Sequence, residues 1–149
     1  MTEILPNLYL AGIEEVIEEC ETHAMNITHI LNVASEIVTD RSFEYKYKHR
    51  GVIDDDDEND ISQIFSECID WIEEALSNDS KVIVHCWSGI SRSVCVVLAY
   101  MIAKRGYTPE KALSTVMEKR PIIDPWKPYF QQLLRWSLQY SIQRIPVGY

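Results

Sequence analysis

Residues 85–93 of this 149-residue chain read His-Cys-Trp-Ser-Gly-Ile-Ser-Arg-Ser, and they combine a nucleophile with a group that binds anions. The thiolate of Cys86 is a strong nucleophile, and the guanidinium of Arg92 presents a planar fork of donors that fits two phosphoryl oxygens. Apolar runs flank the segment, Val82–Val84 before it and Val94–Ala103 after it. The pattern predicts a strand, a tight loop and the start of a helix.

The predicted loop also surrounds the thiol with backbone donors. Successive N–H groups in such a loop can converge on one point, which the N-terminus of the following helix makes electropositive. We expect the substrate-binding residues to be Trp87, Ser88, Gly89, Ile90, Ser91 and Arg92. For Trp87 we expect mainly the backbone N–H to be used, with the indole turned away from the phosphate. The segment is therefore interpreted as a phosphate-binding loop that contains a nucleophile.

The composition is typical of a small enzyme. With 46% hydrophobic residues the chain can bury one core, so we expect a single catalytic domain over residues 1–149. The formal net charge of −9 disfavours nucleic acid and anionic membranes as partners. No basic leader precedes an apolar stretch near the N-terminus, and no apolar run reaches the length of a membrane span. We therefore expect no membrane association.

The four cysteines show neither the density of a disulfide scaffold nor the spacing of a zinc site. We expect reduced thiols and a cytoplasmic or nuclear location, or both. Cys68 and Cys95 lie on apolar helical stretches and are interpreted as core thiols. His23, His29 and His49 do not have the spacing of metal ligands, so we expect no metal. We expect no other cofactor either. The oligomeric state cannot be read from the sequence.

Hydrophobic periodicity predicts alternating strands and helices. Besides the flanks of the Cys86 loop, the predicted strands are Ile4–Leu10, Ile27–Val33 and Tyr45–Ile53, and the predicted helices are Glu14–Glu21, Asp60–Leu76, one opening at Thr108-Pro109, and Pro128–Gln143. Asp60 and Gln63 are interpreted as a capping pair. The alternation predicts an α/β fold with a central, mostly parallel, twisted sheet flanked by helices. The Cys86 loop follows the carboxyl end of a strand, where ligands bind in such folds.

The Cys-x5-Arg-Ser motif preceded by His resembles the active-site signature of the cysteine-dependent protein tyrosine phosphatases. The string Gly-Ile-Ser-Arg-Ser is similar to the dual-specificity branch, and the segment Arg120–Ile123 resembles its small atypical members. Further similarity lies in Leu5–Leu10, Ile27–Val33, Leu98–Met101 and Arg120–Ile123, so the resemblance covers about Ile4 to Gln139. It implies a phosphatase fold in which the phosphate-binding loop joins a strand to a helix.

The resemblance also implies a two-step hydrolysis through a phosphocysteine, without metal. Cys86 attacks phosphorus while Arg92 and the loop amides hold the equatorial oxygens. The Ser93 hydroxyl then stabilises the leaving thiolate, and His85 orders the loop backbone from behind. Taken alone, a histidine at a strand end is more often structural, so His85 is interpreted as a supporting residue.

A proton donor is also required, because an alkoxide is a poor leaving group. Members of the family place an aspartic acid on a loop ahead of the amphipathic helix, and here the candidates are the run 54–57, all aspartates. Aligning Ile61 with the start of the family's helix selects Asp55 as the acid. Asp54 is the nearest rival, and the rest of the run is interpreted as a solvated loop.

The resemblance implies phosphorylated proteins as partners, with phosphotyrosine and phosphoserine or phosphothreonine as substrates. The alternatives are a phosphoinositide or RNA substrate, a phosphoprotein-binding module with weak turnover, and a rhodanese-type sulfurtransferase. The loop has no lysine for extra phosphates, and the acidic composition disfavours RNA. A binding module would usually lack the cysteine, the arginine or the acid, and Ser-Arg-Ser fits phosphate better than sulfur transfer.

Two features are left open by the sequence. The segment Lys46–Arg50 contains three bases and a histidine, which would form either a basic rim for acidic substrates or the outward face of a strand. The family usually has Asn where this chain has Trp126, and that amide supports the phosphate loop. Either another residue supports the loop here, or the site is less rigid and slower than in relatives.

Overall fold

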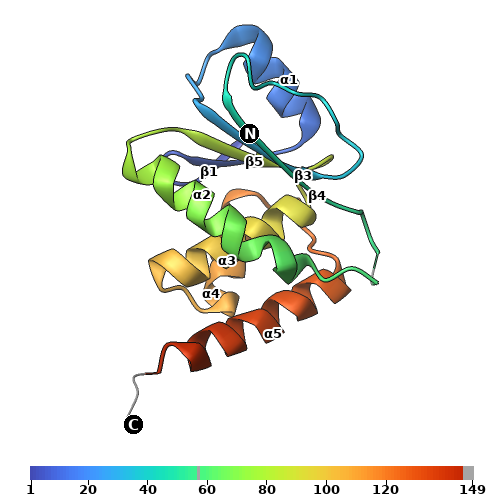
Figure 1. Ribbon diagram of the computed structural model, residues 1–149, viewed down its shortest axis with the longest axis vertical. Coiled ribbons are helices and arrows are strands. Elements are labelled where there is room, and N and C mark those ends of the chain that lie inside the picture. Colours follow the sequence, from blue (N-terminus) through green and yellow to red (C-terminus); the bar gives the residue numbers. More distant parts are fainter. Residues whose placement is uncertain (57, 146–149) are drawn as a thin grey trace.

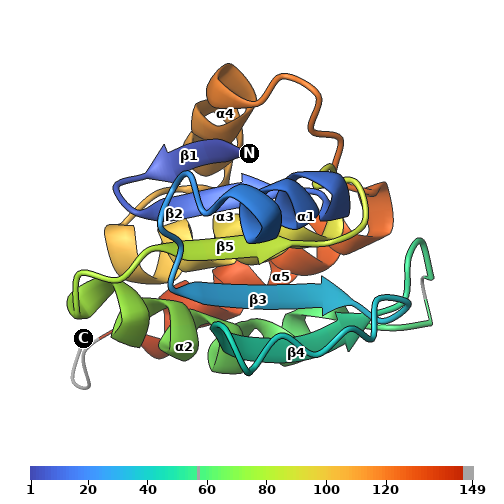
Figure 2. The same cartoon turned by 90° about the horizontal axis from the view of Figure 1, so that it is seen from above.

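The computed structural model describes residues 1–56 and 58–145, and within them five strands form one sheet with helices on both faces (Figure 1). The strands are β1 (Thr2–Leu5), β2 (Leu8–Ala11), β3 (His29–Ala34), β4 (Lys46–Val52) and β5 (Val82–His85). Their order is β1-β2-β5-β3-β4; β1 and β2 are antiparallel, and every other pair is parallel (Figure 2). The predicted α/β fold with a mostly parallel sheet is confirmed.

The helices cover the two faces unequally. Those described are α1 (Ile13–Thr22), a 3-10 turn (Ile61–Ile64), α2 (Phe65–Ser77), α3 (Arg92–Arg105), α4 (Pro109–Lys119) and α5 (Lys127–Gln143). Helix α1 lies alone on one face, while α2 to α5 lie on the other (Figure 1). The larger core is built on this second face around α3, which is buried from Arg92 to Ile102. No helix of the described chain is long and apolar enough to cross a bilayer.

Two local predictions are corrected. The predicted strand Ile4–Leu10 is a hairpin, because Asn7 takes a left-handed backbone with φ 69° after Pro6 and turns the chain between β1 and β2. The helix predicted from Asp60 starts as the 3-10 turn: the Asp60 carboxylate accepts from the Ser62 N–H at 3.0 Å, and the Gln63 N–H donates to the Asp60 carbonyl instead of to its carboxylate.

The sheet register places the Cys86 loop at the centre of one edge. In the parallel pairs, Ala11 of β2 and Asn32 of β3 both lie opposite His85, the last residue of β5. The carboxyl ends of three neighbouring strands therefore meet where the loop begins. This is the edge at which α/β sheets bind ligands.

Candidate active site

The nucleophile predicted from the sequence lies between two buried elements. Cys86 follows β5, all four residues of which are buried, and precedes α3; its own side chain is 2% exposed. Its Sγ lies 3.1 Å from the Oγ of Ser93, in the first turn of α3. Because a hydroxyl can donate to a thiolate, this contact matches the geometry expected for Ser93.

Backbone donors of the loop are available at the same place. No backbone N–H of residues 87–91 donates a hydrogen bond to another residue of the described chain. The loop leads directly into the N-terminus of α3, which has 14 residues and no acidic residue in its first turn. Unpaired N–H groups beside a helix N-terminus bind anions.

Gly89 makes the tight loop possible. Its φ of +69° lies in the left-handed region, and a Cβ there would lie 2.6 Å from the carbonyl carbon of Ala11 and 2.7 Å from the guanidinium of Arg120. The loop is therefore pressed against β2, and glycine is required for both conformation and space.

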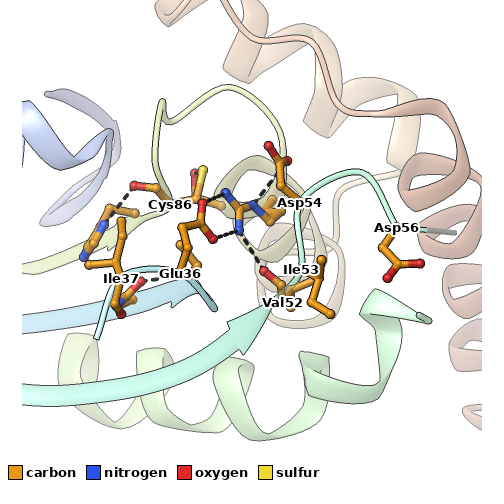
Figure 3. Close-up of polar contacts among 12 residues, drawn as sticks. Glu36, Ile37, Val52, Ile53, Asp54, Asp56 and Cys86 are labelled. Carbon is orange, nitrogen blue, oxygen red and sulfur yellow. Dashed lines mark hydrogen bonds and ion pairs between the residues drawn. The ribbon is translucent and has the colours of Figure 1, made fainter. Parts of the chain in front are cut away.

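Arg92 is held by contacts with Glu36, Val52 and Asp54, which are labelled in Figure 3. Its two Nη atoms each donate to a carboxylate oxygen of Glu36 at 2.6 Å, and Nη1 also donates to the Val52 carbonyl at 2.7 Å. The Nε lies 3.5 Å from Oδ1 of Asp54. Burial opposes the charge, but the hydrogen bonds to Glu36 together with the nearby charges of Cys86, Asp54 and Glu36 outweigh it and raise the pKa of Arg92. The guanidinium is thus oriented before any substrate binds.

Glu36 is a site residue that the sequence reasoning missed. The hydrogen bonds from Arg92 lower the pKa of this carboxyl, which favours the carboxylate. A signal was present in the sequence: Glu36 follows β3 by two residues, and so belongs to the same sheet edge as the Cys86 loop.

Asp54 and Asp55, the two candidates for the acid, both lie in an exposed turn after β4. Asp55 has a left-handed backbone with φ 47°. Partial loss of hydration and the neighbouring Asp54 carboxylate raise the pKa of Asp55, against a lowering effect of Arg92. The phenol of Tyr129, from α5, donates to the Ile53 carbonyl and accepts from the Asp56 N–H at 3.4 Å. The fourth aspartate of the run, residue 57, lies outside the described residues.

His85 lies behind the loop and is 2% exposed. Its Nδ1 is 3.0 Å from the carbonyl oxygen of Cys86. Since a carbonyl only accepts, Nδ1 must carry the proton. Burial lowers the pKa of His85 to about 4, so the ring is neutral at physiological pH and fixes the backbone at the nucleophile.

Arg120 and Trp126 support the loop from its other side. The buried guanidinium of Arg120 donates from Nε to the Gly89 carbonyl at 3.0 Å and from Nη2 to Glu15 at 2.7 Å. The backbone N–H of Trp126 donates to the Ser91 Oγ at 2.8 Å. Of the two possibilities raised by the missing asparagine, the structure favours the first, because other groups hold the loop.

The segment Lys46–Arg50 belongs to β4, the edge strand of the sheet. Lys48 and Arg50 bind the Glu67 carboxylate of α2 at 2.7 and 2.6 Å, and Nε2 of His49 lies 2.8 Å from the Ala34 carbonyl oxygen. Of the two interpretations that the sequence allowed, these contacts favour the strand face.

Two cavities adjoin the phosphate-binding loop. One, of about 420 Å³, is lined by Asp54, Asp55, Ser88, Ile90, Ser91, Asp124, Pro125, Trp126 and Lys127. The other, of about 530 Å³, lies between the loop and α1. The other thiols of α2 and α3, Cys68 and Cys95, are buried as predicted, and burial raises the pKa of each to about 12.

Comparison with known proteins agrees with this geometry. Residues 8–139 match the family model described as dual specificity phosphatase, catalytic domain. Dual specificity protein phosphatase 1 of Arabidopsis thaliana is 38% identical over 138 residues, which are 91% of this chain and 69% of that protein. Human dual specificity protein phosphatase 4 is 36% identical over 92% of this chain, but the chain spans only 34% of its length.

Solved structures give the same assignment. The crystal structure of DUSP15 is 29% identical, with a TM-score of 0.83 over 98% of this chain and 97% of that one. The crystal structure of human DUSP28 has a TM-score of 0.85 over 96% of this chain and 99% of that one; at 23% identity it supports the fold alone. The chain therefore belongs to the family of dual specificity phosphatase catalytic domains.

Proposed function

We propose that the chain hydrolyses phosphotyrosine and phosphoserine or phosphothreonine in proteins, through a phosphocysteine at Cys86. The observation that carries the proposal is the position of the Cys86 thiol. It contacts the Ser93 hydroxyl inside a loop of unpaired N–H groups, at the sheet edge where Glu36 orients Arg92.

Arg92 keeps donors for the substrate. A guanidinium has five N–H groups, and Glu36 and Val52 take three of them. The Nε–H and one Nη2–H remain, and they form a fork that fits two phosphoryl oxygens. Asp54, 3.5 Å from Nε, must give way when a phosphoryl group binds this fork.

In the first step the Cys86 thiolate attacks phosphorus. The S–P bond forms and the ester P–O bond breaks, while the protonated carboxyl of Asp55 gives its proton to the departing oxygen. The raised pKa of Asp55 supports this choice, because it keeps more of the carboxyl protonated. Asp54 is the weaker candidate, because its carboxylate lies 3.5 Å from the Arg92 Nε, where the phosphoryl group of the substrate would bind.

In the second step water attacks the phosphocysteine. The carboxylate of Asp55 takes a proton from the water, the new P–O bond forms and the S–P bond breaks. The Ser93 hydroxyl donates to the departing thiolate of Cys86, 3.1 Å away, and inorganic phosphate leaves. Asp55 then carries the proton needed for the next cycle.

The substrate class follows from the surroundings of the loop. Residues 87–91 are uncharged, so no lysine is present to bind a second phosphate of an inositol ring or of a triphosphate end. Open cavities on both sides of the loop leave room for the flanking residues of a protein chain. We infer phosphorylated proteins as partners, no nucleic acid or membrane partner, and a cytoplasmic or nuclear location, in keeping with four unbridged cysteines.

The experiment is a panel of phosphotyrosyl and phosphothreonyl peptides, a soluble phosphoinositide and an RNA with a 5′-triphosphate, each assayed with and without a chelator. We expect turnover of both peptides, unchanged by the chelator. Turnover of the phosphoinositide or the RNA alone would replace the proposal with a non-protein substrate. Binding of phosphopeptides without any release of phosphate would indicate a binding module.

A further inference from the structure

We infer that the groove between the phosphate-binding loop and α1 binds an arginine side chain of the substrate, close in sequence to the phosphorylated residue. The groove is lined by Gly12, Ile13, Glu14, Glu15, Ile17, Trp87 and Ser88. The inference rests on the proposed function, because the ligand is a phosphorylated peptide held at the same loop.

The groove is continuous with the catalytic loop. The Ile13 N–H donates to the Trp87 carbonyl at 2.8 Å, so the first turn of α1 is bonded to the residue after the nucleophile. A Cβ on Gly12 would lie 2.8 Å from the carbonyl carbon of Ser88, which shows how closely the two segments approach. A peptide whose phosphoryl group reaches Cys86 therefore has its neighbouring residues at the mouth of this groove.

The walls of the groove combine apolar surface with a carboxylate. Trp87 is 58% exposed and Ile17 is 41% exposed, both unusually open for large apolar side chains. Glu14 is exposed and belongs to the same lining. An arginine side chain fits both kinds of surface, because its methylene stem covers apolar groups while its guanidinium stacks on indole and pairs with carboxylate.

The charge of Glu14 is available to a ligand, unlike that of its neighbour. Glu15 binds Arg120 and the N-terminal amine, and its carboxylate also accepts from the Gly12 N–H. Glu14 forms no ion pair with another residue of the described chain. The groove therefore presents one uncompensated negative charge beside an aromatic face.

The other side of the loop is acidic as well. The cavity of about 420 Å³ on that side carries the carboxylates of Asp54, Asp55 and Asp124, and Lys127 is the only base among the described residues that line it. This charge distribution disfavours acidic or multiply phosphorylated segments next to the reacting phosphate. A purely aliphatic occupant would cover Trp87 and Ile17 but would leave Glu14 unpaired, so arginine is the better match.

The experiment compares phosphotyrosyl peptides that differ at one position, which holds arginine, citrulline, leucine or glutamate. Each position from three before to three after the phosphotyrosine is varied in turn. Affinity is measured on Cys86→Ser protein, and kcat/KM on the wild type, with a small aryl phosphate as reference. At one or two positions we expect arginine to exceed citrulline and leucine by about tenfold, with glutamate weakest.

Matched variants on α1 locate the effect. Glu14→Gln should remove most of the advantage of arginine over citrulline, and Glu14→Lys should reverse the order of arginine and glutamate. Glu18→Gln makes the same change on the same exposed helix, but Glu18 lies outside the lining of the groove. This control should keep the full preference, and all three variants should hydrolyse the aryl phosphate like the wild type.

Several results would overturn the inference: no preference for arginine in the binding measurements, a preference for leucine that Glu14→Gln leaves unchanged, or equal losses in Glu14→Gln and Glu18→Gln. The proposed function fails separately. If Cys86→Ser protein binds arginine peptides with the predicted preference while the wild type releases no phosphate from them, the groove assignment stands and the protein phosphatase assignment falls.

Discussion

The phosphate-binding loop and the aspartate turn are the two halves of the proposed site, and the protein holds them very differently. The loop from Cys86 to Arg92 is fixed by contacts with β2, α3, Glu36 and Arg120. The turn from Asp54 to Asp56 is exposed or half-buried, and its polar contacts with distant segments of the described chain are the ion pair to Arg92 and the bond to the Tyr129 hydroxyl.

The difference matches the task of each half. Negative charge on the phosphoryl oxygens in the transition state is stabilised best by hydrogen-bond donors that need no reorganisation, so the loop has to be rigid. The proton donor must approach leaving groups of different size, and an exposed turn can adjust to them. The loop is therefore expected to determine whether reaction occurs, and the turn to determine how fast poor leaving groups depart.

The largest effect is expected for the nucleophile. Cys86→Ser should lower kcat by about 10⁴-fold or more for every leaving group, because an unactivated hydroxyl replaces a thiolate. Steady-state assays with aryl phosphates measure this loss. Cys20→Ser is the control, since Cys20 lies in the last turn of α1 and is not part of the loop, and it should retain activity. Comparable activity of Cys86→Ser and wild type would remove the loop from the chemistry.

Asp55→Asn should have the next largest effect, and it tests whether the aspartate turn supplies the proton donor. We expect kcat to fall by about 10²- to 10⁴-fold with an alkyl phosphate and far less with a good aryl leaving group. The acid must be protonated, so wild-type kcat should fall as pH rises through the pKa of Asp55, which is above the ordinary value. Asp55→Asn should lose this alkaline limb. If Asp54→Asn shows these changes instead, the acid is Asp54.

Glu15→Gln tests how much the bonds between Glu15 and Arg120, which supports the loop, contribute to the free energy of unfolding. Burial opposes the charge of Glu15, but hydrogen bonds from Arg120 and the N-terminal amine prevail and lower its pKa to about 2. A carboxyl with a depressed pKa stabilises the fold above its ordinary pKa of 4.5, and that contribution disappears as pH falls towards 2. Glu15→Gln should cost about 2 kcal/mol of unfolding free energy at neutral pH.

Urea denaturation measures this cost at a series of pH values. The difference in unfolding free energy between wild type and Glu15→Gln should narrow as the pH falls below 4.5. Glu18→Gln, on the same helix and without an ion pair in the described chain, should match the wild type throughout. A gap that does not change with pH would show that charge on Glu15 is not what holds the loop.

Glu36→Gln should have the smallest effect. It keeps the shape of the side chain but weakens the paired hydrogen bonds that orient Arg92, so we expect kcat/KM to fall about tenfold and inhibition by vanadate to weaken in parallel. Glu36→Asp should recover part of both. Unchanged vanadate affinity in Glu36→Gln would mean that Arg92 is positioned without Glu36.

The sequence predicted the loop well because its constraints are local. A buried strand, a glycine that permits a left-handed turn and a helix start at Arg92 are all properties of consecutive residues. The mostly parallel sheet followed from the same alternation of elements. The hairpin at Asn7 was missed because β1 and β2 together read as one apolar run.

Contacts between distant segments could not be read in the same way. Glu36 binds Arg92 across 56 positions, and Arg120 binds Glu15 across 105, so only the fold brings these pairs together. Asp55 was selected over Asp54 only by alignment with the family, since neighbouring residues of one type give no local signal. The raised pKa of Asp55 and the ion pair of Asp54 support the choice of Asp55, and both depend on where the fold places the turn.

The most direct test of the account is rapid-quench labelling with a substrate that carries a radioactive phosphoryl group. We predict that label becomes covalently bound to the wild-type protein within one turnover, maps to the peptide containing Cys86, and is absent from Cys86→Ser. Turnover of substrate without protein-bound label at any quench time, or equal labelling of Cys86→Ser, would contradict the phosphocysteine mechanism.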